Sequence, residues 1–155
     1  MRCLIVVLLL LGGCVQTSSF ILGDEVEPPI GCVVGSLRGV DCYALLQDVL
    51  SEAHRGHKYV TDYAQYGVEE YWTPSLVGDC EDFALWVKAE LEKRGIAADL
   101  VVALTEDGEG HAVIHVGGWI LDNRYKYVVS IDELRYTWIS IGRAGKWYDV
   151  ITTRR

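Results

Sequence analysis

Two stretches of the chain repeat apolar residues at the spacing of one helix face. The first has Asp41 where an N-cap belongs and ends near Gly56, with apolar residues recurring between them at intervals of three and four. The second has acids in its first turn, basic residues near its end and a terminating Gly95, as the helix dipole and a C-terminal glycine favour. These patterns predict one helix from Asp41 to about Gly56 and another from Asp79 or Cys80 to Gly95.

Short apolar runs separated by turn residues follow the second helix and indicate strands. Gly117 and Gly118 separate two of these runs, which is the signal of a two-residue hairpin. Positions 59–77 mix aromatic and polar residues without a sustained period, so a short helix and a loop are expected there. Because helices come first and antiparallel strands follow, the expected fold class is α+β. The expected strands cover residues 100–105, 111–116, 119–123, 127–130 and 147–151.

The N-terminal segment, residues 1–14, has the pattern of a lipoprotein-type signal peptide. Residues 4–11 are all apolar, too few to cross a bilayer as a helix, which takes about 20 residues, but typical of a secretion signal. The run ends in Leu-Gly-Gly-Cys14, which resembles the lipobox of bacterial lipoproteins and implies acylation of Cys14. We therefore expect an exported, membrane-anchored lipoprotein that faces the periplasm or the cell exterior. An ordinary signal cleaved nearby and an uncleaved anchor are the alternatives.

Length and composition allow one domain with a substantial core. The chain has 155 residues, and 50% of them are hydrophobic, so a packed core needs no metal to hold it together. Residues 15–29 combine Ser, Thr, acids and proline, which indicates a tether, and residues 30–155 form the expected domain. The net charge of -8 excludes a nucleic-acid partner, because phosphate binding needs clustered lysine and arginine.

The cysteines divide between lipid, disulfide and free thiol. Cys3 falls in the discarded segment and Cys14 would carry lipid, so three cysteines remain in an oxidising compartment and one of them stays unpaired. Cys32 and Cys42 lie ten residues apart across a loop with glycines, which suits a local bridge. The alternative is that both are buried and reduced. With the bridge, Cys80 is the odd thiol.

The predicted hairpin places two histidines near one acid. With Gly117 and Gly118 as its turn, both His111 and His115 share a face with Asp122 and are its diagonal neighbours, so geometry alone leaves the two histidines open. A cysteine at a helix start, a histidine on a strand and an acid on the next strand supply a thiolate, its general base and the group that orients the base. The dipole of the helix lowers the pKa of a thiol at its N-terminus.

These residues lie in motifs that resemble a known family. GDCEDFAL around Cys80, then G-HAVIHV and WILDN, together with an upstream EEYWTP, are similar to the bacterial transglutaminase-like cysteine proteinases, a papain-like branch that includes the LapG-type proteases. The resemblance covers about residues 63–148. It implies a transglutaminase-like, papain-like core in which the nucleophile begins a helix packed on an antiparallel sheet. It also implies that Cys80 is the nucleophile, His111 the base and Asp122 the orienting acid, with His115 structural.

Three acids surround the cysteine, and they oppose its ionisation unless something compensates them. Asp79, Glu81 and Asp82 either cap the helix and stabilise its dipole, which needs no metal, or are neutralised by a cation. Carboxylate oxygens suit Ca²⁺, and the resemblance implies calcium bound by Asp79 and Glu81, with Asp82 as a further ligand. Calcium takes about 6 to 8 oxygens, so backbone carbonyls, water or a distant acid would complete the shell.

Attack on an amide also needs donors for the developing oxyanion. The backbone N–H of Cys80 at the helix start is one candidate, and the indole N–H of Trp72 is another. Tyr71 and Trp72 are equally candidates for the core or for a substrate groove.

The expected function is cleavage of a peptide or protein substrate by an exported cysteine peptidase through a Cys-His-Asp triad. The same triad would also serve an acyltransferase or an amidase acting on a non-peptide amide. A third reading is a calcium-binding lipoprotein that binds a partner while its triad stays idle.

Overall fold

The structure is a computed structural model that describes residues 39–150. The expected signal peptide, the tether, and Cys14 and Cys32 lie outside these residues. Within the described part of the chain, no helix combines the length and the apolar character needed to cross a membrane.

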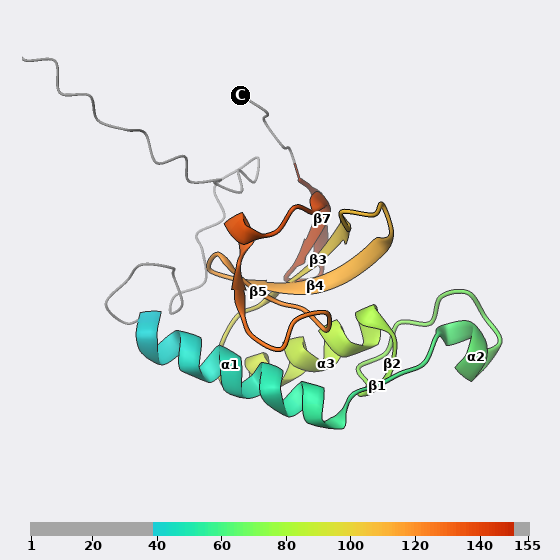
Figure 1. The fold of residues 1–155 in the computed structure, drawn as a ribbon, viewed down its shortest axis with the longest axis horizontal. Helices are drawn as coiled ribbons and strands as arrows, with labels where there is room; N and C mark the ends of the chain where they lie inside the picture. The colour runs from blue at the N-terminus through green and yellow to red at the C-terminus, as the bar shows by residue number, and fades with distance from the viewer. Residues whose placement is uncertain (1–38, 151–155) are drawn as a thin grey trace, which may run out of the picture.

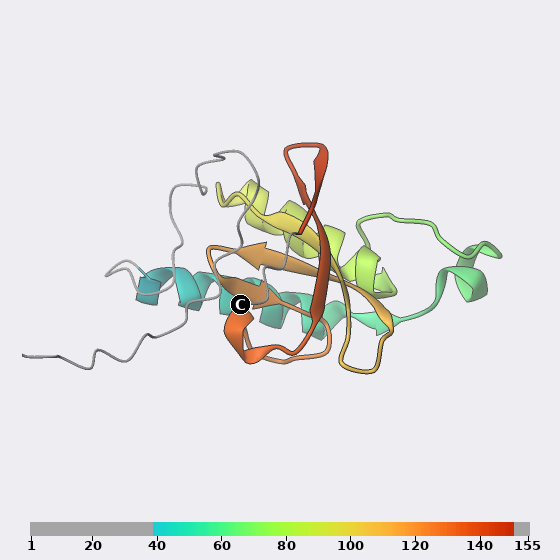
Figure 2. The same cartoon turned by 90° about the horizontal axis from the view of Figure 1, so that it is seen from above.

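Two long helices form one layer. Helix α1 (Gly39–Gly56) begins two residues before the predicted Asp41 and ends at the predicted glycine. Helix α3 (Cys80–Lys93) has Asp79 as its N-cap, as expected, and Gly95 follows it with φ of 75°. Both helices lie along the same face of the sheet (Figure 1), and the view from above shows them side by side (Figure 2).

A six-stranded antiparallel sheet forms the other layer, in the order β6-β5-β4-β3-β7-β8. The α+β prediction is therefore confirmed, although it missed β7, which lies beside the central β3. The β4–β5 register matches the prediction, with Val116 opposite Trp119 across a turn in which Gly117 and Gly118 have φ of 56° and 95°. The strands are β3 (Asp99–Leu104), β4 (Gly110–Val116), β5 (Trp119–Leu121), β6 (Val129–Ser130), β7 (Thr137–Arg143) and β8 (Lys146–Asp149).

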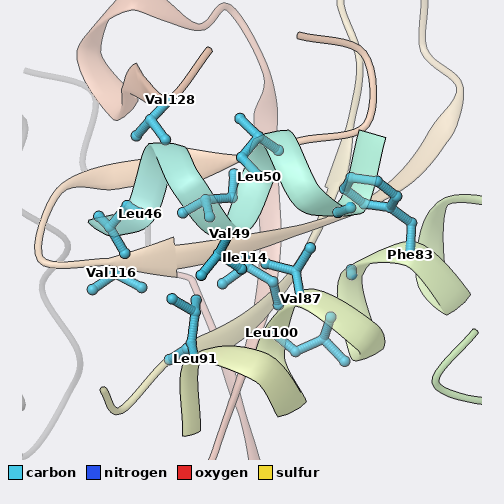
Figure 3. Packing of buried hydrophobic residues seen from close by; sticks show 14 of the residues in the cluster. Leu46, Val49, Leu50, Phe83, Val87, Leu91, Leu100, Ile114, Val116 and Val128 are labelled. Atoms are coloured by element: carbon cyan, nitrogen blue, oxygen red, sulfur yellow. The ribbon is translucent and has the colours of Figure 1, made fainter. Parts of the chain in front are cut away.

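Strand β4 contributes to a core on each face of the sheet because its side chains alternate. Ala112, Ile114 and Val116 pack into the core under the helices, whereas Val113 packs into a second core on the opposite face. In Figure 3 the apolar side chains of α1 and α3 gather against those of the sheet. Fully buried members of the helix-side core are Leu46, Val49, Leu50, Ala53, Val87, Leu91 and Ile114.

A small accessory region connects the two long helices. Strands β1 (Lys58–Tyr59) and β2 (Val77–Gly78) pair in parallel, and α2 (Asp62–Tyr66) lies between them in sequence. Helix α2 and its loop project from the main body in both views (Figures 1 and 2), which agrees with the short helix and loop predicted there. Because β2 directly precedes α3, the pairing closes this region beside the start of α3. A short 3₁₀ turn, Ile131–Glu133, follows β6.

The cysteines of the described residues differ in state. Cys42 is disulfide-bonded; its pairing with Cys32 involves a residue outside the described part of the chain and stays a prediction. Cys80 is a free cysteine. The thiol expected to be unpaired is therefore reduced at the first position of α3.

Candidate active site

Cys80 sits at the first residue of α3, and its thiol donates a hydrogen bond to Glu81 Oε2 at 3.0 Å. Burial, the hydrogen bond to Glu81 and the charges of Glu81 and Asp79 raise the pKa of Cys80 to about 12, against the lowering effect of the Ala112 backbone N–H. This is opposite to the direction expected from the helix dipole, because burial and the carboxylates outweigh it. The thiol therefore keeps its proton and donates it in a hydrogen bond to Glu81.

His111 lies at the start of β4 and carries the interaction that a base needs. Its Nε2 donates to Asp122 Oδ1 at 2.8 Å, because an ionised carboxylate can only accept. Both residues are buried, with 8% of His111 and 1% of Asp122 exposed. The other ring nitrogen, Nδ1, has no hydrogen-bond partner in the described part of the chain. Asp122 follows β5 directly, so the glycine turn between β4 and β5 sets this pairing.

Cys80 and His111 line the same pocket, which has a volume of about 370 Å³. Cys80 enters it from the helix layer and His111 from the sheet layer. The Ala112 N–H directed at the sulfur comes from the residue next to His111, which keeps the start of α3 close to β4. The other lining residues are Tyr59, Thr105, Asp107, Glu109, Gly110, Asn123 and Arg124.

His115, the other histidine of β4, belongs to a different network. It lies opposite Asp99 in the β3–β4 ladder, with Nδ1 3.4 Å from Asp99 Oδ2. Its Nε2 accepts the N–H of Gly118 at 3.0 Å, so Nδ1 carries the proton and points at the carboxylate. Arg143 binds the same carboxylate through two nitrogens. The sequence left open which histidine pairs with Asp122. In the structure His111 pairs with Asp122, and His115 pairs with Asp99.

Asp122 has two further donors that the sequence patterns did not indicate. Tyr136 donates its hydroxyl to Oδ2 at 2.8 Å, and the backbone N–H of Arg124 donates to Oδ1 at 2.8 Å. Tyr136 is 14 residues from Asp122 and precedes β7, a strand that the sequence did not predict, so nothing local placed it here.

A cluster of carboxylates lies beside the cysteine. Ligand oxygens of Asp62, Asp79 and Asp82 fall within 4.8 Å of one another, and one buried oxygen of each has no hydrogen-bond partner. Asp62 and Asp82 are 1% and 0% exposed. Burial raises the pKa of Asp82; the Thr73 N–H lowers it, and the charges of Asp62 and Asp79 raise it further. Asp62 was not predicted; it comes from α2, 17 positions before Asp79 in the sequence.

Glu81 belongs to a second carboxylate group, with Asp62 and Glu70. Burial raises the pKa of Glu81 to about 7, with Asp79 adding to the rise against the Cys80 hydrogen bond. Unpartnered buried oxygens are costly in a folded protein, and hard oxygen donors are those that Ca²⁺ prefers. The donor set, which includes all three predicted metal residues and adds Asp62, therefore fits a hard cation.

Tyr71 and Trp72, the predicted oxyanion or substrate residues, lie away from the pocket lining. The Trp72 indole N–H donates to Glu70 Oε2 at 2.7 Å, and the side chain is 42% exposed. The backbone N–H of Tyr71 donates to Asp62. The structure thus connects both residues to the carboxylate cluster.

Comparison with known proteins identifies the family of the chain. Residues 39–155 match the family model described as bacterial transglutaminase-like cysteine proteinase. No curated protein sequence matches the chain.

Solved structures of LapG from Legionella pneumophila share the fold. A LapG structure, a calcium-bound one and an EGTA-treated one give TM-scores of 0.60, 0.61 and 0.62 at 20%, 20% and 19% identity. The alignments cover 68%, 72% and 72% of this chain and 67%, 70% and 69% of those chains. At this identity the likeness establishes a transglutaminase-like fold.

Proposed function

The chain belongs to the bacterial transglutaminase-like cysteine proteinase family, and on that premise we propose that it cleaves a peptide or protein amide with a Cys80-His111-Asp122 triad. The observation that carries the proposal is the 2.8 Å bond from His111 Nε2 to Asp122, in a pocket that His111 shares with Cys80. Nδ1 of His111, which has no hydrogen-bond partner within residues 39–150, is the atom left to accept a proton.

Each residue then has one task. His111 Nδ1 takes the proton of the Cys80 thiol, and the sulfur attacks the scissile carbonyl carbon. His111 returns the proton to the leaving amine, and a thioester remains on Cys80. Water, deprotonated by His111, attacks the thioester and releases the carboxylic acid and the thiol. Asp122 holds the imidazole in the tautomer that exposes Nδ1.

The oxyanion would form beside the start of α3. The first amides of a helix have no intrahelical partners, so the backbone N–H of Cys80 is the donor that supports this role. Trp72 supports it less, since its indole N–H is bonded to Glu70.

We place a calcium site at Asp62, Asp79, Glu81 and Asp82. The support is the set of unpartnered buried oxygens, together with the calcium-bound form of LapG. When bound, the ion supplies positive charge among carboxylates that otherwise oppose the thiolate. In the structure, Glu81 Oε2 accepts a hydrogen bond from the Cys80 thiol. An oxygen engaged in this bond is less available as a calcium ligand.

Export and lipid anchoring at Cys14 remain part of the proposal, supported by the pattern of residues 1–14. An anchored enzyme would act on substrates near a membrane surface.

The triad is tested by alkylating the full chain with iodoacetamide and following Cys80 by peptide mass spectrometry, with Ca²⁺ or with EGTA. We expect fast modification in calcium, slower modification in EGTA, and a rate at least about tenfold lower in His111→Ala. His115→Gln is the matched control and should label at the wild-type rate. Equal rates in wild type and His111→Ala would contradict the triad, and no response to EGTA would contradict the calcium site.

A further inference from the structure

The hydroxyl of Tyr136 lies between a donor, Arg124, and an acceptor, Asp122, and the Tyr125 side chain also hydrogen-bonds to it. Arg124 Nη1 lies 2.9 Å from the hydroxyl oxygen, and Asp122 Oδ2 lies 2.8 Å from it. A guanidinium can only donate and a carboxylate can only accept. The hydroxyl therefore accepts from Arg124 and donates to Asp122, so both bonds have a fixed direction.

Tyr136 is suited to remain a neutral donor at this position. It is 7% exposed, and burial followed by the charge of Asp122 raises its pKa well above the ordinary tyrosine value. Its ring also packs edge-on against His111, with ring centroids 5.8 Å apart. One side chain thus contacts both the imidazole and the carboxylate that orients it.

Arg124 extends this arrangement to the pocket. Its guanidinium pairs through two nitrogens with Glu106, at 2.9 Å and 3.1 Å, and lies over the Tyr136 ring at 5.5 Å from the centroid. Arg124 also lines the pocket that holds Cys80. A continuous chain of hydrogen bonds therefore leads from the pocket rim to Asp122.

The three donors divide the two oxygens of Asp122 between them. Among residues 39–150, Oδ1 accepts from His111 and from the Arg124 backbone, whereas Oδ2 accepts only from Tyr136. Loss of the Tyr136 hydroxyl would leave Oδ2 buried without a donor, which is a costly state. The carboxylate would relieve that cost by turning toward another donor, and this would disturb the bond between Oδ1 and His111.

We propose that Tyr136 is a positioning residue of the triad: its hydroxyl fixes the Asp122 carboxylate so that Oδ1 stays on His111, and the Glu106–Arg124 ion pair fixes that hydroxyl. This inference rests on the proposed function, since it assigns a role within that site. Tyr136 itself acts through Asp122 and takes no proton in the proposed reaction.

The test compares Tyr136→Phe with wild type in the full chain, in calcium, by the rate of iodoacetamide alkylation at Cys80. Loss of a hydrogen bond to a buried carboxylate should slow alkylation by about 10-fold to 100-fold. Tyr127→Phe removes an exposed tyrosine hydroxyl and is the matched control, with an unchanged rate expected. In the proton NMR spectrum, the downfield His111 Nε2–H resonance should shift or broaden in Tyr136→Phe and not in Tyr127→Phe.

Arg124→Gln removes the guanidinium that donates to the Tyr136 hydroxyl. Because the Arg124 side chain is partly exposed, this substitution puts folding less at risk. In a double-mutant cycle with Tyr136→Phe, the two rate losses should be strongly non-additive, because Arg124 acts through Tyr136. Should Tyr136→Phe fail to fold, a wild-type rate and an unchanged His111 resonance in Arg124→Gln overturn the inference.

A wild-type alkylation rate in folded Tyr136→Phe also overturns the inference. If His111→Ala slows alkylation in the same experiment, the triad stands and only the role of Tyr136 fails. If His111→Ala has no effect, the proposed function fails first.

Discussion

The carboxylate of Asp82 fills the space that a β-carbon on Gly78 would need, since its Oδ2 would collide with that atom. Strand β2 and the first turn of α3 approach this closely only because residue 78 has no side chain. The approach also brings the Thr73 N–H to Asp82 Oδ1 at 2.8 Å. Gly78 therefore sets the position of one wall of the carboxylate cluster beside the cysteine.

Gly78→Ala should disturb that wall. The added methyl group must displace a fully buried carboxylate, so we expect a loss of about 1–3 kcal/mol of stability and a smaller stabilisation by Ca²⁺. Thermal unfolding with and without calcium measures both effects. Gly110→Ala, where an added β-carbon meets open space, is the control for stability. Equal melting temperatures for Gly78→Ala and wild type would show that Asp82 moves at no cost.

Asp62→Asn should separate charge repulsion from metal binding. The amide keeps an acceptor for the Tyr71 N–H but removes one of three clustered negative charges, so the calcium-free protein should melt at a higher temperature than wild type. Wild type should gain about 2.7 kcal/mol at a calcium concentration 100 times its Kd, and the variant much less at that concentration. Glu69→Gln, an exposed acid outside the cluster, should leave both values unchanged. A variant that retains the full calcium response would remove Asp62 from the ligand set.

Arg143→Met should destabilise the protein in a pH-dependent way. Burial raises the pKa of Asp99, but the hydrogen bonds and charges of Arg143 and His115 bring it below its ordinary value. A lowered pKa contributes stability above the unfolded value of about 4, and this contribution disappears as the pH falls through the folded value. Breaking a buried ion pair costs about 3 kcal/mol, so urea unfolding should show roughly that loss at pH 7.

The difference between Arg143→Met and wild type should narrow once the pH is taken below about 4, the unfolded pKa of an aspartate, toward the lowered pKa of Asp99. Arg135→Met, at an exposed position, controls for the loss of one positive charge. A difference that stays constant between pH 7 and this lower pH would show that Asp99 is not the group responsible.

Gln47→Met should loosen the packing of α1 against the segment that follows Asp122. The Gln47 amide donates to the Lys126 carbonyl at 3.0 Å and accepts the Val128 N–H at 2.9 Å. The substitution removes the partners of both backbone groups, and we expect a loss of about 2 kcal/mol in urea unfolding. Gln65→Met, at an exposed residue of α2, should change stability little. A loss no larger than that of Gln65→Met would mean that water replaces both bonds.

Patterns within single helices and hairpins predicted the positions of Cys80, His111 and Asp122. The stripe and caps of α3 gave the position of Cys80, and the glycine pair between β4 and β5 gave the register that joins His111 to Asp122. The same register did not decide the partner of His115. That partner, Asp99, lies on β3, the other neighbour of β4, and the hairpin pattern carries no information about β3.

Contacts between distant segments could not be predicted in this way. Strand β7 has burial that does not alternate cleanly, so its sequence lacks the period of two that marks a half-buried strand. Tyr136 and Asp62 reach the site only through the path of β7 and the pairing of β1 with β2. In both cases the determining contact is tertiary, and the local sequence contains no signal for it.

Side chains of β4 alternate between the two faces of the sheet. One parity of the β4 positions, from Ala112 on, packs under the helices, and the other carries His111 and His115. A single inserted or deleted residue within β4 would exchange the two sets, so that an imidazole would enter the apolar core and an aliphatic side chain would face Asp122. Length variation among relatives is therefore expected in the turns that flank this strand, where an inserted or deleted residue does not change which side chains face each core.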